Sequence, residues 1–355
     1  MSKLIYYTGM SLLKSNLDVP YMQDFLRVQK FLPPNIGIKD RSGVIKSPFN
    51  IKILNPLPNF TQTFNLSYKD CVMERMSDLD AMHQRTNKNF RLLYSGGVDS
   101  TLILSSFIEY FGLEKTSKIL EIYCTPDSIY ENPWIWERYI TKNNFKIKSS
   151  LNHPNIWNDN MITIQGEGND QLFGSNGKLQ KYLKFNKLTE EFTLEKFTNY
   201  LVSTKQEPND IDARYTTEQY IKIAEKSPIP ITTMHLFSWW TTFVLFWDSL
   251  MVRILVQANT TQLLPGVLEN NLVQFFNTEN FQRWTVANSA TNPLFDHNYK
   301  TVCKDIILGA LDIPEYASKQ KQESWPRVHA LTKTGCMIDS DLRIYKDPID
   351  FLKFL

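Results

Sequence analysis

The sequence has few of the residues that build disulfide frameworks and transition-metal sites. Its four cysteines, Cys71, Cys124, Cys303 and Cys336, lie far apart and form neither a CxxC pair nor a Cys/His cluster with zinc spacing. The five histidines show no metal spacing and no obvious catalytic triad. We therefore expect reduced thiols, and histidines with ordinary packing or surface roles.

The chain also lacks an excess of charge of either sign. Thirty-nine basic residues against thirty-seven acidic ones give a formal net charge of +2, too small for the electrostatic footprint of a dedicated nucleic-acid binder. This balance favours small-molecule ligands over nucleic acid. No basic-then-apolar signal peptide opens the sequence, because Lys14 and Asp18 interrupt its short apolar stretches, and we expect a cytoplasmic location.

Long uncharged apolar runs are absent as well. Segment 237–255 is the most apolar part of the chain, but it contains Asp248 and Arg253. It therefore falls short of the about 18 uncharged apolar residues that a membrane span needs. We expect a buried helix and no membrane association. Its two charged side chains either pair with each other or contact a substrate.

Glycine and proline are unevenly distributed. No glycine occurs between positions 178 and 265, and long stretches of this half have helical periodicity. We expect residues 178–355 to form a mostly helical C-terminal lobe. Residues 1–65 mix short apolar runs with several prolines, which suits short strands and turns, and we treat them as an N-terminal extension of uncertain structure.

Residues 66–177 alternate between helical and strand-like patterns. In chain order, a helix, a strand, a helix and two strands are predicted at 68–83, 90–94, 98–111, 118–123 and 161–164. This alternation predicts an α/β core, a Rossmann-like parallel sheet covered by helices. Its ligand site should lie at the carboxyl ends of the strands.

A glycine pair lies between the first predicted strand and the following helix, in the run Ser95-Gly96-Gly97-Val98-Asp99-Ser100-Thr101. Bare backbone amides and the positive end of a helix can gather phosphate oxygens at such a turn. It is not a Walker A loop, because the GxxxxGK[ST] spacing is missing. The alternative is an ordinary strand-to-helix turn, in which Asp99 only favours the helix N-terminus.

The run resembles the SGGxDS loop of the ATP pyrophosphatase superfamily, whose members cleave ATP between the α and β phosphates. That resemblance implies an adenine nucleotide α-hydrolase-like fold and an ATP site. The implied ATP and pyrophosphate ligands in the loop are Ser95, Gly96, Gly97, Val98, Asp99 and Ser100. Asp99 would also help to hold Mg²⁺.

A second motif, Ile164-Gln165-Gly166-Glu167-Gly168-Asn169-Asp170-Gln171-Leu172-Phe173-Gly174, follows the last predicted strand. Its glycines permit a tight turn that presents Glu167 and Asp170 on one side. The motif resembles the SGEGxDELFGGY segment of asparagine synthetases and β-lactam synthetases. The alternative is a surface turn whose two acids are solvated.

Together the motifs imply a carbon–nitrogen ligase of the asparagine-synthetase type, with ATP and Mg²⁺ as cofactors. Such an enzyme adenylates a small-molecule carboxylate, releases pyrophosphate, and transfers the acyl group to ammonia or an amine. By this resemblance Asp99 and Asp170 hold the metal, Gly166 lies in the ATP site, and Glu167 assists the incoming amine. Magnesium prefers oxygen ligands and commonly shares carboxylates with phosphates, which fits the two aspartates.

Two further segments have weaker parallels in the family. Residues 318–324 resemble the segment that carries a catalytic lysine near the α-phosphate, and we assign this role to Lys321, with Lys319 as the alternate. A cation there would balance charge between the α and β phosphates. Residues Thr125-Pro126-Asp127 follow the second predicted strand, where the superfamily encloses adenine.

The region 246–277 departs from the family pattern. Its helix only faintly resembles the KVDRxSM segment, and Leu272, Gln274 and Asn277 replace the arginine, proline and aspartate of the RVPFLD segment. The acid-substrate pocket is therefore altered, and the sequence leaves open whether aspartate is the substrate. The resemblance spans roughly residues 68–330.

The glutaminase domain of full-length asparagine synthetases is not expected here. Residue 2 is Ser2 instead of the nucleophilic cysteine, and only about ninety residues precede the phosphate loop. Nitrogen would then come from free ammonia, a substrate amine or a separate nitrogen-donor protein. Compact standalone proteins of this kind resemble those encoded by viruses and phages.

Two other functions remain open from the sequence. One is adenylation of a nucleobase in RNA or a nucleoside by another member of the ATP pyrophosphatase superfamily. The other is a non-catalytic nucleotide-binding partner of a larger complex. Homo-oligomerisation is open too.

Overall fold

The structure, a computed structural model, describes residues 2–33, 35–61, 63–149, 157, 160–174, 189–203, 210–257, 263, 265–289, 300–318 and 336–355. Its centre is a five-stranded parallel sheet in the order β4-β3-β2-β5-β6. The strands are β2 (Asn89–Leu93), β3 (Leu120–Cys124), β4 (Lys146–Ser149), β5 (Met161–Gln165) and β6 (Leu272–Gln274). The expected α/β fold with a Rossmann-like parallel sheet is therefore confirmed.

The helices around this sheet largely begin and end where the sequence predicts. Helix α3 (Tyr68–Thr86) begins at Ser67, whose side chain forms a capping box with Asp70. Helix α4 (Val98–Phe111) follows β2 and stops at Gly112. The shorter helices of this part are α5 (Leu113–Ile119), α6 (Pro126–Glu131), α7 (Pro133–Ile135), the π-helix η1 (Trp136–Ile140) and the 3-10 helix η2 (Thr141–Asn143).

Burial explains why the inner strands could be predicted from the sequence and the edge strand β4 could not. The inner strands β2, β3 and β5 are almost entirely buried, as expected for parallel strands covered on both faces. Strand β4 lies at the sheet edge, and all four of its residues are exposed. Its sequence, KIKS, has lysines that protect an edge from further pairing but carries little apolar signal.

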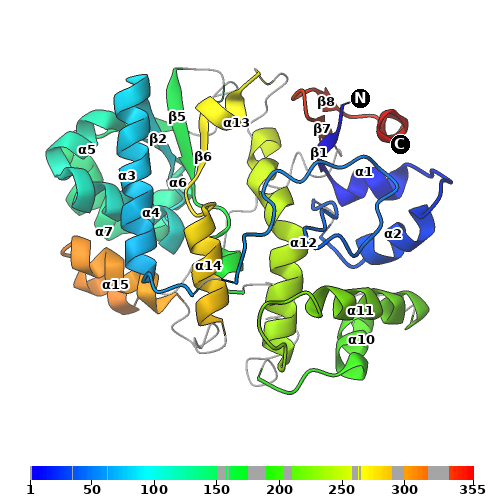
Figure 1. Cartoon of the computed structure of the whole chain (residues 1–355). Helices are drawn as coiled ribbons and strands as arrows, with labels where there is room; N and C mark the ends of the chain where they lie inside the picture. The colour runs from blue at the N-terminus through cyan, green and yellow to red at the C-terminus, as the bar shows by residue number, and fades with distance from the viewer. Residues whose placement is uncertain are drawn as a thin grey trace.

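The C-terminal half is mostly helical, as predicted. After α8 (Asn169–Leu172), which still belongs to the predicted core, the described helices of this half are α10 (Leu194–Ser203), α11 (Asp210–Ala224), α12 (Met234–Gln257), α13 (Val267–Asn270), α14 (Glu279–Asn288), α15 (Thr301–Ala310) and η4 (Pro314–Ser318). Figure 1 shows α12 running through the middle of the molecule. This helix is long and apolar enough to cross a membrane, yet 83% of its most apolar window is buried inside the protein. The expected buried helix is confirmed.

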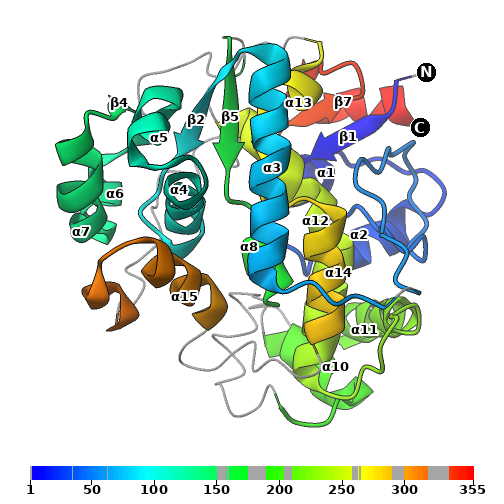
Figure 2. The same ribbon diagram turned by 60° about the vertical axis from the view of Figure 1, so that its left-hand side comes forward.

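A small antiparallel sheet joins the two ends of the chain, in the order β1-β7-β8. It consists of β1 (Leu4–Tyr7), β7 (Met337–Asp339) and β8 (Ile344–Tyr345), flanked by α1 (Gly9–Lys14), α2 (Met22–Gln29) and η7 (Pro348–Phe354). Both termini lie beside this sheet, to the right of the parallel sheet in Figures 1 and 2. The β1–β7 pairing connects the N-terminal extension (1–65) with the C-terminal lobe (178–355). Strand β6 comes from the same C-terminal lobe and pairs with β5 of the core sheet.

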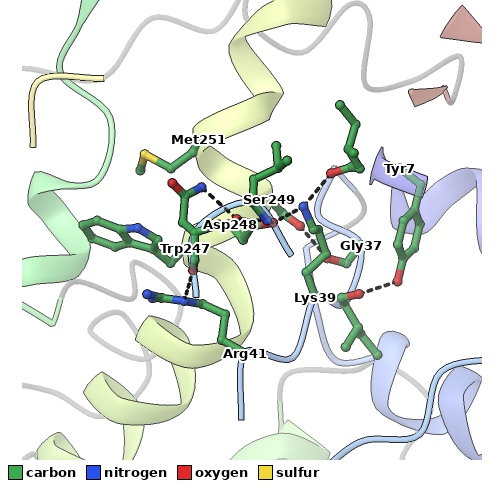
Figure 3. A network of polar contacts seen from close by, with 12 residues as sticks. Tyr7, Gly37, Lys39, Arg41, Trp247, Asp248, Ser249 and Met251 are labelled. Carbon is green, nitrogen blue, oxygen red and sulfur yellow. Dashed lines mark hydrogen bonds and ion pairs between the residues drawn. The ribbon is translucent and has the colours of Figure 1, made fainter. Parts of the chain in front are cut away.

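Buried charges hold the N-terminal segment against α12. Figure 3 shows the Lys39 side chain reaching the Asp248 carboxylate, where the two form an ion pair. Both side chains are 0% exposed, and the Lys39 ammonium also donates to the Ile5 carbonyl at 2.5 Å. The backbone amides of Leu54 and Asn55 donate to Asp248 at 3.1 and 2.7 Å. Both members of this enclosed ion pair have further hydrogen-bond partners, which is what makes buried charges tolerable.

Arg41 makes a second connection nearby. Its guanidinium donates to the carbonyls of Asn55 (2.7 Å), Phe243 (3.1 Å) and Pro56 (3.1 Å), and it also contacts Gln282. Segment 36–57 has little regular secondary structure. Its polar contacts to α12 and α14 hold it in place instead.

Candidate active site

The predicted phosphate loop lies at the carboxyl end of β2 and leads directly into α4. Gly96 has a φ of +76°, a left-handed conformation that favours glycine. A Cβ at this position would also collide with the Ser128 carbonyl and approach Glu131 Cβ to 2.8 Å. The loop is therefore pressed against α6, whose first residues include the predicted Thr125-Pro126-Asp127 segment.

Hydroxyl groups hold the loop in shape. The Oγ atoms of Ser95 and Ser100 lie 3.1 Å apart, and the Ser95 backbone amide donates to Ser100 Oγ at 3.2 Å. The Gly97 amide donates to Ser95 Oγ at 3.4 Å. Because the first amides of a helix lack intrahelical partners, the start of α4 at Val98 offers N–H groups to an anion beside this loop.

The second motif forms the turn between β5 and α8. Gly168 has a φ of +98°, and a Cβ there would lie 2.7 Å from Met251 Cε on α12. A Cβ on Gly166 would approach Asp99 Cβ to 3.2 Å. The two predicted glycine turns thus touch each other, although about 70 residues separate them in the sequence.

Asn169 joins the two turns by hydrogen bonds. Its Nδ2 donates to Asp99 Oδ1 at 2.6 Å, while its Oδ1 accepts from the Tyr68 hydroxyl at 2.5 Å. Nδ2 also lies 3.6 Å from Cys303 Sγ. Tyr68 and Asn169 are both buried, so α3 and α15 help to fix the direction of the Asp99 carboxylate.

The side chain that completes the cluster is Lys300, which the sequence reasoning missed. Its ammonium donates to Asp99 Oδ1 at 2.5 Å and pairs with Asp170 Oδ1 at 2.6 Å. Lys300 lies at the N-terminus of α15 with a φ of +62°. Such a backbone conformation is uncommon for a lysine, and residues of this kind often occur at functional sites. No local pattern marks this lysine, because its partners lie far away in the sequence.

The two aspartates differ from Lys300 in their access to solvent. The Lys300 side chain is 2% exposed, against 25% for Asp99 and 38% for Asp170. The surrounding protein raises the pKa of Asp99 above its usual value, and the neighbouring Asp170 carboxylate adds to this, while the Lys300 ammonium opposes it. The cluster is therefore open on its acidic side.

The pair of carboxylates fits a magnesium ion. Asp99 and Asp170 point their oxygens at one cation, and the Lys300 ammonium stands in for that positive charge. The described residues contain no group of three His, Cys, Asp or Glu side chains that could hold a metal ion. Magnesium sites that bind nucleotides commonly use one or two carboxylates and complete their coordination with phosphates and water.

Glu167 faces a different partner, Arg253 on α12. Arg253 Nη2 donates to Glu167 Oε1 at 2.7 Å. Burial lowers the pKa of Arg253, but the Glu167 carboxylate outweighs this and holds that pKa above its usual value. Arg253 does not pair with Asp248, as one sequence interpretation allowed, because Asp248 bonds to Lys39 instead.

The segment 272–277, which departs from the asparagine-synthetase pattern, packs against α12. Leu272 is buried in β6, Gln274 donates to the Met251 carbonyl, and Asn277 Oδ1 accepts from Trp247 Nε1 at 2.9 Å. These polar groups are occupied by neighbouring side chains and backbone. Lys321 and Lys319, predicted to contact the α-phosphate, lie outside the described residues.

No model of a known protein family matches the chain. No curated protein matches it significantly. The features that bear on function are therefore the two motifs and the contacts between them.

Proposed function

We propose that the protein is an ATP-dependent, amide-forming ligase that adenylates a carboxylate and then transfers the acyl group to ammonia or an amine. The observation that carries this proposal is the meeting of Asp99 and Asp170, one from each motif, on a single cation position. A phosphate loop alone would fit any enzyme of the superfamily. The second loop adds Glu167, whose carboxylate would take up a proton from the attacking amine.

The proposed reaction divides between the two turns. In the first step a carboxylate oxygen attacks the α-phosphorus of ATP, the bond to the β-phosphate oxygen breaks, and pyrophosphate leaves. The amides at the start of α4 and the hydroxyls of Ser95 and Ser100 would hold the departing phosphates. Magnesium, when bound between Asp99 and Asp170, would neutralise the phosphate oxygens.

The second step uses Glu167. An amine attacks the acyl carbon, AMP leaves, and the proton released by the nitrogen passes to the Glu167 carboxylate. Arg253 orients this carboxylate through the 2.7 Å contact with Oε1, which leaves Oε2 for the substrate. Glu167 remains 28% exposed, so a substrate can reach it.

Pyrophosphate exchange tests the proposal. Purified protein with Mg²⁺, ATP and labelled pyrophosphate should form labelled ATP only when the correct acid is present, and a scan of amino acids and other carboxylates would identify that acid. Asp99→Asn and Asp170→Asn should abolish exchange. Glu167→Gln should spare exchange more than amide formation, because it acts in the second step.

Three outcomes would redirect the assignment. Release of ADP instead of AMP would refute cleavage between the α and β phosphates. Exchange that depends on a nucleoside or RNA would favour nucleobase adenylation. Nucleotide binding without exchange across all acids would favour the non-catalytic partner.

A further inference from the structure

The Lys300 ammonium bridges the two carboxylates of the cluster that it forms with Asp99 and Asp170. It lies 2.5 Å from Asp99 Oδ1 and 2.6 Å from Asp170 Oδ1. The ammonium lies on the closed side, whereas the carboxylates remain partly exposed. A cation arriving from solvent therefore meets carboxylate oxygens that a lysine already occupies.

Lys300 is held in this position by the fold. It immediately precedes α15, whose Cys303 is buried against Asn169, and its left-handed backbone aims the side chain at both aspartates. The ammonium lies between Asp99 Oδ1 and Asp170 Oδ1, so a divalent ion cannot take the position between these two oxygens while the lysine is there. Their like charges would also repel strongly in such a crowded site.

We infer that Lys300 is a built-in counter-ion, which holds Asp99 and Asp170 together in the nucleotide-free protein and competes with the divalent ion for them. This inference rests on the proposed function for the identity of the metal site. A nucleotide phosphate would give the displaced ammonium an anionic partner. The divalent ion and the nucleotide should therefore bind together, and the ion alone should bind weakly.

Titration with Mn²⁺ tests the competition without any substrate. Free Mn²⁺ is followed by electron paramagnetic resonance as it is added to wild-type protein and to Lys300→Met. We expect at least tenfold tighter Mn²⁺ binding by the variant in the absence of nucleotide. We also expect Lys300→Met to bind a non-hydrolysable ATP analogue more weakly than wild type in the presence of Mn²⁺. The variant lacks the ammonium that would contact the nucleotide phosphate.

Matched variants separate charge from packing. Lys300→Arg keeps the positive charge and should retain wild-type Mn²⁺ affinity within about twofold, a change smaller than 0.5 kcal/mol. Lys69→Met removes an exposed lysine paired with Glu109 at 2.6 Å and should change nothing at the site. If Lys300→Met does not fold, Lys300→Gln, a neutral residue that still donates hydrogen bonds, should show the same tightening.

Unchanged or weaker Mn²⁺ affinity in the neutral variants would overturn the counter-ion. Failure of the proposed function has a different signature. Tighter Mn²⁺ binding by Lys300→Met, combined with no pyrophosphate exchange by wild type, would support the counter-ion and refute the ligase. Exchange by wild type with Mn²⁺ affinity insensitive to Lys300 would refute the counter-ion alone.

Discussion

Two lysines of this protein each meet buried or half-buried carboxylates, but their surroundings differ. Lys39 and Asp248 are fully enclosed, and backbone amides of residues 54 and 55 complete the carboxylate's hydrogen bonds. Lys300 is buried, while its partners Asp99 and Asp170 are open to solvent. The enclosed pair joins two segments of the chain, whereas the open cluster is the cation site that we propose. Access to solvent, more than the identity of the charges, distinguishes the two.

The sharpest way to break this comparison is to remove one carboxylate from each region. Asp248→Asn leaves the Lys39 ammonium buried without its counter-charge and should lower the free energy of unfolding by about 3–5 kcal/mol. Asp170→Asn alters a 38%-exposed side chain and should cost less than about 1 kcal/mol. Urea unfolding followed by tryptophan fluorescence measures both.

A companion variant tells charge from shape in the enclosed pair. Adding Lys39→Met to Asp248→Asn removes the uncompensated charge and should recover part of the lost stability. Equal losses in Asp248→Asn and Asp170→Asn would show that the two regions do not differ in the way described.

The pH dependence of stability sharpens the role of burial. Burial lowers the pKa of His235, on the same helix as Asp248, to about 3. Below pH 6.5 His235 takes up a proton in the unfolded chain but stays neutral in the folded protein. The contribution of neutral His235 to the free energy of unfolding is therefore present above pH 6.5 and is lost as the pH falls toward 3. Between pH 7 and pH 4.5 the loss should be about 2–3 kcal/mol.

His235→Gln isolates this contribution. Its unfolding free energy, measured by urea titration at several pH values, should fall less steeply than that of wild type over the same interval. Parallel pH profiles for the two proteins would mean that His235 does not contribute.

Gly168 tests whether the geometry of the second turn matters to the open cluster. Gly168→Ala places a side chain at φ +98° against Met251, and Gly43→Ala places one at φ +72° with nothing within 4 Å. Backbone strain should cost each variant about 1–2 kcal/mol. Only Gly168→Ala should also lower pyrophosphate exchange, because it displaces Asp170. Equal rates of pyrophosphate exchange in both variants would show that the Gly168 turn does not position Asp170 for the reaction.

The smallest effect is expected for an ion pair at the surface. Lys69→Met breaks the contact with Glu109, in which the two side chains are 49% and 28% exposed. Its stability in urea should change by less than about 1 kcal/mol. A larger loss would mean that partial exposure weakens ion pairs less than the comparison assumes.

The elements next to the motifs could be predicted because their signals are local. The strand before Ser95, the glycine turn and the helix ending at Gly112 are consecutive in the sequence, and each carries its own apolar pattern. The edge strand β4 was missed because its residues are exposed and mostly polar. Strand β6 was missed because three residues are too short for a pattern.

The polar partners could not be predicted for a different reason. Lys300 meets Asp99 and Asp170, and Arg253 meets Glu167, only after the chain has folded. The sequence marks these side chains as candidates, except Lys300, but it does not show which of them form pairs: Asp99, Glu167, Asp170, Asp248 and Arg253. The expectation for Asp248 illustrates this, since its partner is Lys39 in the segment that was hardest to interpret.

The pairing of Leu4 with Asp339 in the β1–β7 sheet has a consequence for synthesis on the ribosome. The first strand is made long before its partner, so this edge of β1 has no partner strand until residues 337–339 have been made. Contacts between such distant residues slow folding, because a long loop must close before they form. A nascent chain halted before residue 337 would therefore lack the partner strand of this edge of β1.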